Sequence, residues 1–145
     1  MTHEDAGHYA VKHSPDTRLD PRIAGAIKKK IANDRITCAA AHKIAGELDV
    51  LPADVGVAID LMEARISRCQ LGLFGYSPEQ RIVKPAENVT LELEEMIKRS
   101  LVNKRLSCAS AWGIARKLGI PKMSVSAACE ALKIKISSCQ LGSFR

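Results

Sequence analysis

The chain repeats itself at a fixed spacing of 70 residues, and this duplication constrains the fold more than any other feature. Nineteen of the 48 aligned pairs from Ile27/Ile97 to Phe74/Phe144 are identical. A repeat unit of about 55 residues is near the lower limit for a self-sufficient hydrophobic core. We therefore expect two similar small domains that pack on each other or dimerise.

Each repeat opens with a pattern that predicts two helices. Asp20, followed by proline, is typical of an N-cap, and Thr90 takes the same place in the second copy. Isoleucines at four-residue spacing predict that the first helix runs to about Arg35. Thr37 and Ser107 are capping residues for the second helix.

A tight turn follows the second helix of each repeat. Gly119 readily adopts the left-handed conformation that ends helices, and Asp49 is among the few other residues that tolerate it. Pro121 cannot continue the second helix but suits the start of a third. The connection between the second and third helices therefore has three or four residues. The third helices are expected to end near Met62 and Leu132.

The stretch from Ala115 to Leu132 resembles the helix–turn–helix pattern of bacterial and archaeal transcription regulators. The residues that carry the resemblance are Ala115, Leu118, Gly119, Ile120, Ser124, Val125, Ser126 and Leu132. The stretch from Ala45 to Met62 matches the same pattern more weakly. This resemblance implies DNA binding through the third helix, and it places the segment after that helix where a winged helix has its β-wing.

The resulting fold class is mainly α, with two tandem three-helix repeats that each end in a short β-strand or wing. ARISRCQLGLF and IKISSCQLGSF close the copies, and their β-branched residues predict the strands. With one strand in each copy, we hypothesise that the two strands pair with each other. The expected organisation is a flexible arm over 1–19, repeats over 20–75 and 90–145, and a linker over 76–89.

Positive charge is concentrated in the second repeat. The net charge is +6, and residues 96–145 hold ten basic side chains against Glu130 as their one acidic residue. Phosphate backbones attract such a surface through Coulomb attraction and counterion release. Double-stranded DNA is therefore the expected partner, with dimerisation supplying a second recognition helix.

A recognition helix contacts base edges with its first residues, while flanking basic side chains hold phosphates. The predicted DNA-binding residues are Arg116, Lys117, Lys122, Met123, Ser124, Ser126, Lys133 and Lys135. The first copy carries Asp54, Asp60 and Glu63 in this region, and these carboxylates would repel phosphates. That copy is expected to supply packing, dimerisation or partner contacts. The alternative function is a protein-interaction or scaffold module that does not bind DNA.

Four of the five cysteines are matched between the copies, as the pairs Cys38/Cys108 and Cys69/Cys139. A thiol just after an N-cap has a lowered pKa, which favours reactivity, and four thiols brought together would bind a metal. However, no two cysteines are spaced as C-x-x-C. Buried packing residues are the favoured interpretation, and a redox- or metal-sensing regulator is the other.

No enzyme, cofactor or small-molecule ligand is indicated. P-loop, GxSxG and HExxH patterns are absent from the sequence, and His3, His8 and His13 share no helical face. Neither an apolar run of about 18 residues nor a signal peptide is found. An odd cysteine number without a secreted-scaffold pattern fits a reducing compartment, so we expect a cytoplasmic protein.

Overall fold

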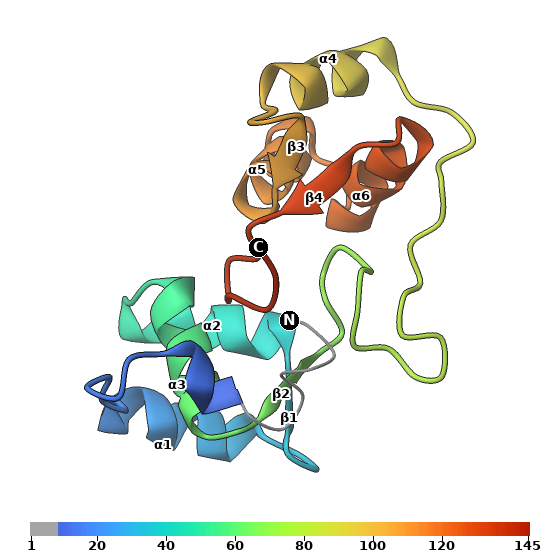
Figure 1. Cartoon of the computed structure of the whole chain (residues 1–145). Coiled ribbons are helices and arrows are strands. Elements are labelled where there is room, and N and C mark those ends of the chain that lie inside the picture. The colour runs from blue at the N-terminus through green and yellow to red at the C-terminus, as the bar shows by residue number, and fades with distance from the viewer. Residues whose placement is uncertain (1–8) are drawn as a thin grey trace. The chain divides into compact units, whose positions relative to one another are not determined.

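A computed structural model describes residues 9–145 of the chain (Figure 1). The chain forms two compact units. Unit 1 contains the described residues up to Cys69 together with Gln140–Arg145, and unit 2 is Gln70–Cys139. This division differs from the expected boundaries at 20–75 and 90–145, because the two segments that follow the cysteines are exchanged between the repeats.

Both units have the same order of elements after their first residues. Unit 1 contains the 3-10 helix η2 (Tyr9–Lys12), α1 (Pro21–Lys30), β1 (Arg35–Thr37), α2 (Cys38–Leu48), α3 (Pro52–Leu61) and β2 (Arg65–Ser67). Unit 2 contains α4 (Leu91–Arg99), β3 (Arg105–Ser107), α5 (Cys108–Leu118), α6 (Lys122–Ala131) and β4 (Lys135–Ser137). The expected mainly helical fold, with two tandem repeats that end in short strands, is confirmed.

Side-chain caps start the helices where the sequence predicts them. The Asp20 carboxylate accepts from the Arg22 amide at 2.8 Å, which begins α1. The Thr37 hydroxyl accepts from the Ala40 amide at 3.1 Å and thereby caps α2. Thr90 and Ser107 cap α4 and α5 in the same way. Each cap satisfies an amide that has no partner inside its helix.

The turn between the second and third helices is confirmed in both units. Asp49 has φ 54° and Gly119 has φ 65°, so both residues adopt the left-handed conformation. In unit 1, the amide of Val50, the residue after Asp49, donates to the Ala45 carbonyl at 3.0 Å. This bond closes the end of α2 before α3 begins at Pro52.

Each closing strand pairs with a strand of its own repeat, so the hypothesis that the two closing strands pair with each other is wrong. β1 pairs in parallel with β2, and β3 pairs in parallel with β4. The first helix also ends earlier than expected, at Lys30. Asn33 and Asp34 have φ 52° and 59°, which turns the chain into β1. A helix pair then separates the two strands, as a parallel connection requires.

The core of each unit lies between its three helices and its strand pair. In unit 1, Ile27, Ile36 and Ile59 are at most 1% exposed, and unit 2 places Ile97 and Leu106 at two of the matched positions. The first helix of each unit packs against the second and third. Within residues 9–145, no helix has the length and apolar character needed to cross a bilayer.

A segment from the other repeat completes each unit. Leu141 is 2% exposed within unit 1, where its carbonyl lies against Gly56 of α3. Leu71 is fully buried within unit 2, and its carbonyl accepts a hydrogen bond from α6. Figure 1 shows the red segment that ends the chain lying against the unit formed by α1 to α3.

Candidate nucleic-acid interface

The expected recognition helix, α6, is covered along one face. Ser126 is fully buried, and its hydroxyl donates to the Leu71 carbonyl at 2.5 Å. A buried hydroxyl that is already bonded cannot contact a base edge, so the assignment of Ser126 as a DNA-binding residue is not supported by this structure. Its role here is to hold the segment that begins at Gln70.

The residues that cover α6 come from the end of the expected first repeat and from the expected linker. Met123 packs with its thioether against Gly72. The amide of Ala86 donates to the Ala127 carbonyl at 3.0 Å, and Arg81 forms an ion pair with Glu130. Positions 123, 126, 127 and 130 lie on one face of a helix. Arg81 and Ala86 of the expected linker 76–89 therefore pack on α6.

The third helix of unit 1 is covered in an equivalent way. Tyr9 is 2% exposed and packs with η2 against α3. The Asp60 carboxylate, at the position matched by Glu130, accepts from His13 at 2.8 Å and pairs with Lys12 at 3.1 Å. Residues 9–13 of the expected flexible arm are therefore bound to unit 1, whereas His3 and His8 lie outside the described residues.

Several of the other predicted DNA-binding side chains remain accessible. Arg116 and Lys117 are exposed in the last turn of α5. Lys122 lies over the Trp112 ring at 4.5 Å from its centroid, which holds this ammonium group near the start of α6. Ser124 is half-buried.

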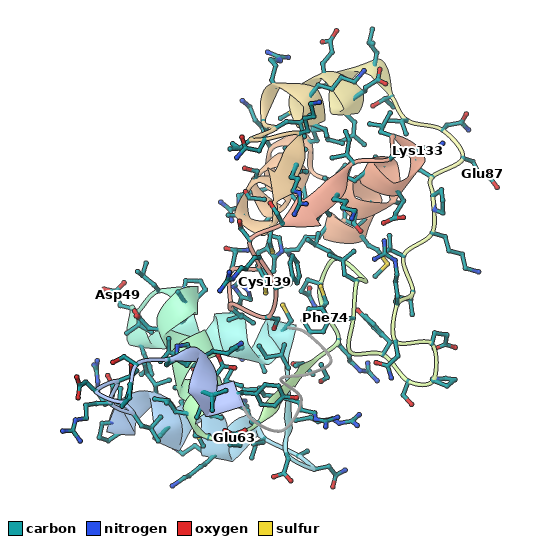
Figure 2. The ribbon with its side chains drawn as sticks, in the orientation of Figure 1. Asp49, Glu63, Phe74, Glu87, Lys133 and Cys139 are labelled. Carbon is teal, nitrogen blue, oxygen red and sulfur yellow. The ribbon has the colours of Figure 1, made fainter. Side chains whose placement is uncertain are left out.

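Four exposed cations gather where β3 and β4 pair. Arg105 and Lys135 are register partners across the parallel ladder, so neighbouring strands place them side by side. Lys104 directly precedes Arg105, and Lys133 lies on the connection from α6 to β4 (Figure 2). All four side chains are exposed. We call Lys104, Arg105, Lys133 and Lys135 the strand patch.

Unit 1 provides an internal comparison for the strand patch. Its residues at the four matched positions are Asp34, Arg35, Glu63 and Arg65. The backbone is the same, because Asp34 and Lys104 have φ 59° and 64°, and Glu63 and Lys133 have φ 55° and 59°. Two acids and two bases cancel in unit 1, whereas the strand patch of unit 2 carries four positive charges.

The sequence prediction found half of this patch. Lys133 and Lys135 were assigned because they follow the expected recognition helix, and Lys104 and Arg105 were not. A position-by-position comparison of the two repeats would have found them, because Lys104 occupies the position that Asp34 has in the first repeat. The pairing of β3 with β4 is needed to show that these residues lie next to Lys133 and Lys135.

A polar hollow of about 580 Å³ opens beside the strand patch. Its lining residues are Val102, Asn103, Arg105, Ser107, Ser137 and Ser138. The amide, guanidinium and hydroxyl groups of this lining are hydrogen-bond donors. Such donors suit phosphate and sugar oxygens, which receive most of the hydrogen bonds that proteins make to DNA.

The hypothesis that four thiols come together depends on pairing between the two closing strands. The strand pairing that would have brought Cys69 toward Cys139 is absent, and residues 9–145 contain no cluster of three or more metal-ligating side chains. Cys38, Cys69 and Cys108 are buried. Burial also raises the pKa of the Cys129 thiol to about 11, which keeps it protonated at neutral pH. The packing interpretation and the redox- or metal-sensing interpretation of the matched cysteines both stay predictions.

Comparison of the chain with protein-family models, with curated proteins and with solved structures finds no match.

Proposed function

We propose that the protein binds double-stranded DNA through the strand patch of unit 2. The observation that carries this proposal is the charge contrast between two otherwise matched sites, with a net +4 in unit 2 and zero in unit 1. Glu63 of unit 1 accepts from the amides of Tyr9 and Ala10 at 2.8 and 2.9 Å, so its charge serves the fold of that unit. The same backbone forms in unit 2 with four cations, which leaves their charge available to a ligand. Phosphates are the natural ligands of such a surface.

In this proposal the contacts position the protein on the phosphate backbone. α6 does not enter the major groove, because residues 71–86 cover the face that would contact bases. Lysine and arginine at the strand patch release counterions when they neutralise phosphates. Four such contacts predict that log K falls with log salt with a slope of about −3.6.

The test uses a variant whose new residues already occur in the protein. Lys104→Asp and Lys133→Glu give unit 2 the residues that unit 1 carries at the same backbone positions. We expect the double variant to fold normally and to lose about half of the salt slope, because two of the four phosphate contacts are replaced by repelling carboxylates. Fluorescence anisotropy with a labelled duplex at several salt concentrations measures this slope.

The control variant is Lys28→Asp/Lys30→Glu, which makes the same change in net charge on exposed positions of α1. If the strand patch holds the DNA, the control keeps the wild-type slope. Equal losses in both variants would mean that net charge alone attracts DNA, and this outcome would refute the assigned site. Absence of binding to any duplex at low salt would refute the function.

A protein-interaction module is the second candidate function, and the covering of α6 favours it. A helix–turn–helix whose third helix is already bonded on one face serves as a packing element in this fold. Under this alternative the Lys104→Asp/Lys133→Glu variant leaves partner binding unchanged, and duplex DNA produces no anisotropy change with either variant.

A further inference from the structure

The hollow beside the strand patch lies on one face of the β3–β4 ladder. Arg105 and Lys135 are register partners in this ladder. Two positions further along, Ser107 pairs with Ser137. Because side chains alternate between the two faces of a strand, these two pairs share one face, while Leu106 is fully buried on the other. The ladder therefore places a pair of hydroxyls directly beside a pair of cations.

The turn before β3 and the end of β4 complete the lining. The amides of Val102 and Arg105 each donate to the carbonyl of the other residue, at 2.8 and 3.0 Å, and this closes the turn. Asn103, inside the turn, has φ 52°, a conformation that asparagine adopts more readily than most residues. Ser138 follows β4 with φ 55°. An amide and a further hydroxyl thus join the groups on the ladder.

Most polar side chains of the lining are available to a ligand. The Ser107 hydroxyl is already bonded to Ser110, from whose amide it accepts at 3.1 Å. The four other polar side chains make no hydrogen bond or ion pair within residues 9–145, and they are Asn103, Arg105, Ser137 and Ser138. All four can donate hydrogen bonds, and the lining contains no carboxylate. An anion with several oxygens matches this set of donors.

The size of the hollow indicates a ligand larger than a simple anion. Its volume of about 580 Å³ falls within the range of about 300–1,000 Å³ that is typical of small-molecule sites. Val102 lines the hollow and is 71% exposed, although valine is usually buried. An organic group attached to the anion would therefore find both room and an apolar contact.

Unit 1 carries matched polar residues next to an acidic side chain. Asn33, Arg35 and Ser67 are identical to their counterparts in unit 2. Asp34, however, takes the position of Lys104. A doubly charged anion is therefore favoured in unit 2 and disfavoured at the matched positions of unit 1. This difference makes the residues of unit 1 suitable for control substitutions.

We propose that the hollow of unit 2 binds the phosphate monoester of a nucleotide. A monoester carries about −1.5 to −2 charges at neutral pH and has three terminal oxygens for the donors of the lining. It also has a free end that can enter a recess, whereas a phosphodiester inside a duplex continues into the strand on both sides. In the hollow Arg105 pairs with the phosphate, Asn103 and Ser137 donate to its oxygens, and Val102 contacts the nucleoside.

Two sources carry this chemistry, a free mononucleotide and the 5′-phosphate end of a DNA strand. The inference goes beyond the binding of duplex DNA and does not rest on it, because a free mononucleotide occupies the hollow without any duplex. A protein that binds the mononucleotide but no duplex would refute the function proposed for the strand patch and leave this inference standing.

Wild-type protein is tested first, with ligands that differ only in a phosphate. Isothermal titration calorimetry compares deoxyadenosine 5′-monophosphate with deoxyadenosine, and anisotropy competition compares a short duplex bearing 5′-phosphates with the same duplex bearing 5′-hydroxyls. Binding of the monophosphate but not of the nucleoside identifies the free nucleotide as a source. A gain in affinity for the phosphorylated duplex alone identifies the strand end. If the phosphate has no effect in either comparison, the proposal is overturned.

The variant Asn103→Gly/Ser137→Val removes two donors without changing the charge. Glycine adopts the left-handed conformation at position 103 without strain, and valine suits a β-strand. Each lost hydrogen bond to the charged phosphate is expected to weaken monoester binding about tenfold or more. The matched control, Asn33→Gly/Ser67→Val, makes the same two changes in unit 1 and is expected to keep the wild-type affinity.

Both variants are expected to keep the wild-type salt slope for the duplex with 5′-hydroxyl ends, because the four cations of the strand patch are unchanged. Equal affinities of the two variants for the monoester would overturn the assignment to the hollow. Circular dichroism checks that both proteins fold. Should the valine disturb folding, Asn103→Gly measured against Asn33→Gly makes the same comparison with one donor, and equal affinities of that pair would overturn the assignment as well.

Discussion

Replacing Gly56 by alanine should destabilise the protein, although the same change at two other helical glycines should stabilise it. Gly25, Gly46 and Gly56 lie inside α1, α2 and α3 of the same unit. In a helix interior, alanine is favoured over glycine by about 0.5–1 kcal/mol. A Cβ at Gly25 or Gly46 meets nothing within 4 Å, so both variants are expected to gain this amount.

At Gly56 the added Cβ would overlap the Leu141 carbonyl, and a carbonyl cannot move aside as a flexible side chain does. The segment must leave its site, which exposes the buried Leu141 side chain at a cost of about 1.5–3 kcal/mol. After subtraction of the helix-propensity gain, Gly56→Ala should lower the free energy of unfolding by about 0.5–2.5 kcal/mol.

Urea denaturation followed by far-UV circular dichroism measures the three free energies, and hydrogen exchange of residues 140–145 reports the release of the segment. Fast exchange in Gly56→Ala, with wild-type exchange in Gly25→Ala and Gly46→Ala, is the expected pattern. A Gly56→Ala protein as stable as Gly46→Ala, with its segment still protected, would refute the argument from the Leu141 contact.

Three further predictions rest on other parts of the structure. Tyr9→Ala should cost about 3–5 kcal/mol of unfolding free energy in urea titrations, because it empties the site of a side chain that is 2% exposed, whereas Val11→Ala, at 74% exposed, should change little. Cys129, whose pKa is raised to about 11, should resist alkylation at pH 8 in the folded protein and react only on unfolding, which peptide mapping detects. The hydrogen bond from the Arg22 amide lowers the pKa of Asp20 from 3.8, so the stabilising carboxylate is fully charged above about pH 5 and becomes protonated as the pH falls below 3.8. The difference in unfolding free energy between wild type and Asp20→Asn should therefore shrink as the pH is lowered from about 5, and a growing difference would contradict this prediction.

The local features of the fold were predictable because their causes lie within a few residues of sequence. Capping by Thr37 and the left-handed turn at Asp49 depend on side chains next to the backbone that they stabilise. The strand pairing was not predictable in this way. β1 has three residues, and its sequence pattern is dominated by the cap of the helix that follows.

The exchange of segments was hidden by the similarity of the repeats. Residues 70–72 and 140–142 are identical, so their sequences do not specify which third helix each one joins. The covering of Ser126 was missed for a related reason. A residue near the start of an isolated helix looks exposed, and its partner Leu71 lies in a segment that the sequence assigns to the other repeat. The strand patch was half predicted, since charge is visible in the sequence but the pairing of β3 with β4 is not.

The exchange of residues 140–145 into unit 1 also determines which unit is synthesised completely first. Unit 2 is continuous in sequence, so all of its residues are available once Cys139 has left the exit tunnel. Unit 1 begins earlier but lacks the partner of Lys12, the Gly142 carbonyl, which lies 130 positions further along the chain. N-terminal domains usually complete their folding first, but here unit 2 can be complete before unit 1. A premature stop codon after Cys139 would leave the later unit whole and damage the one translated first.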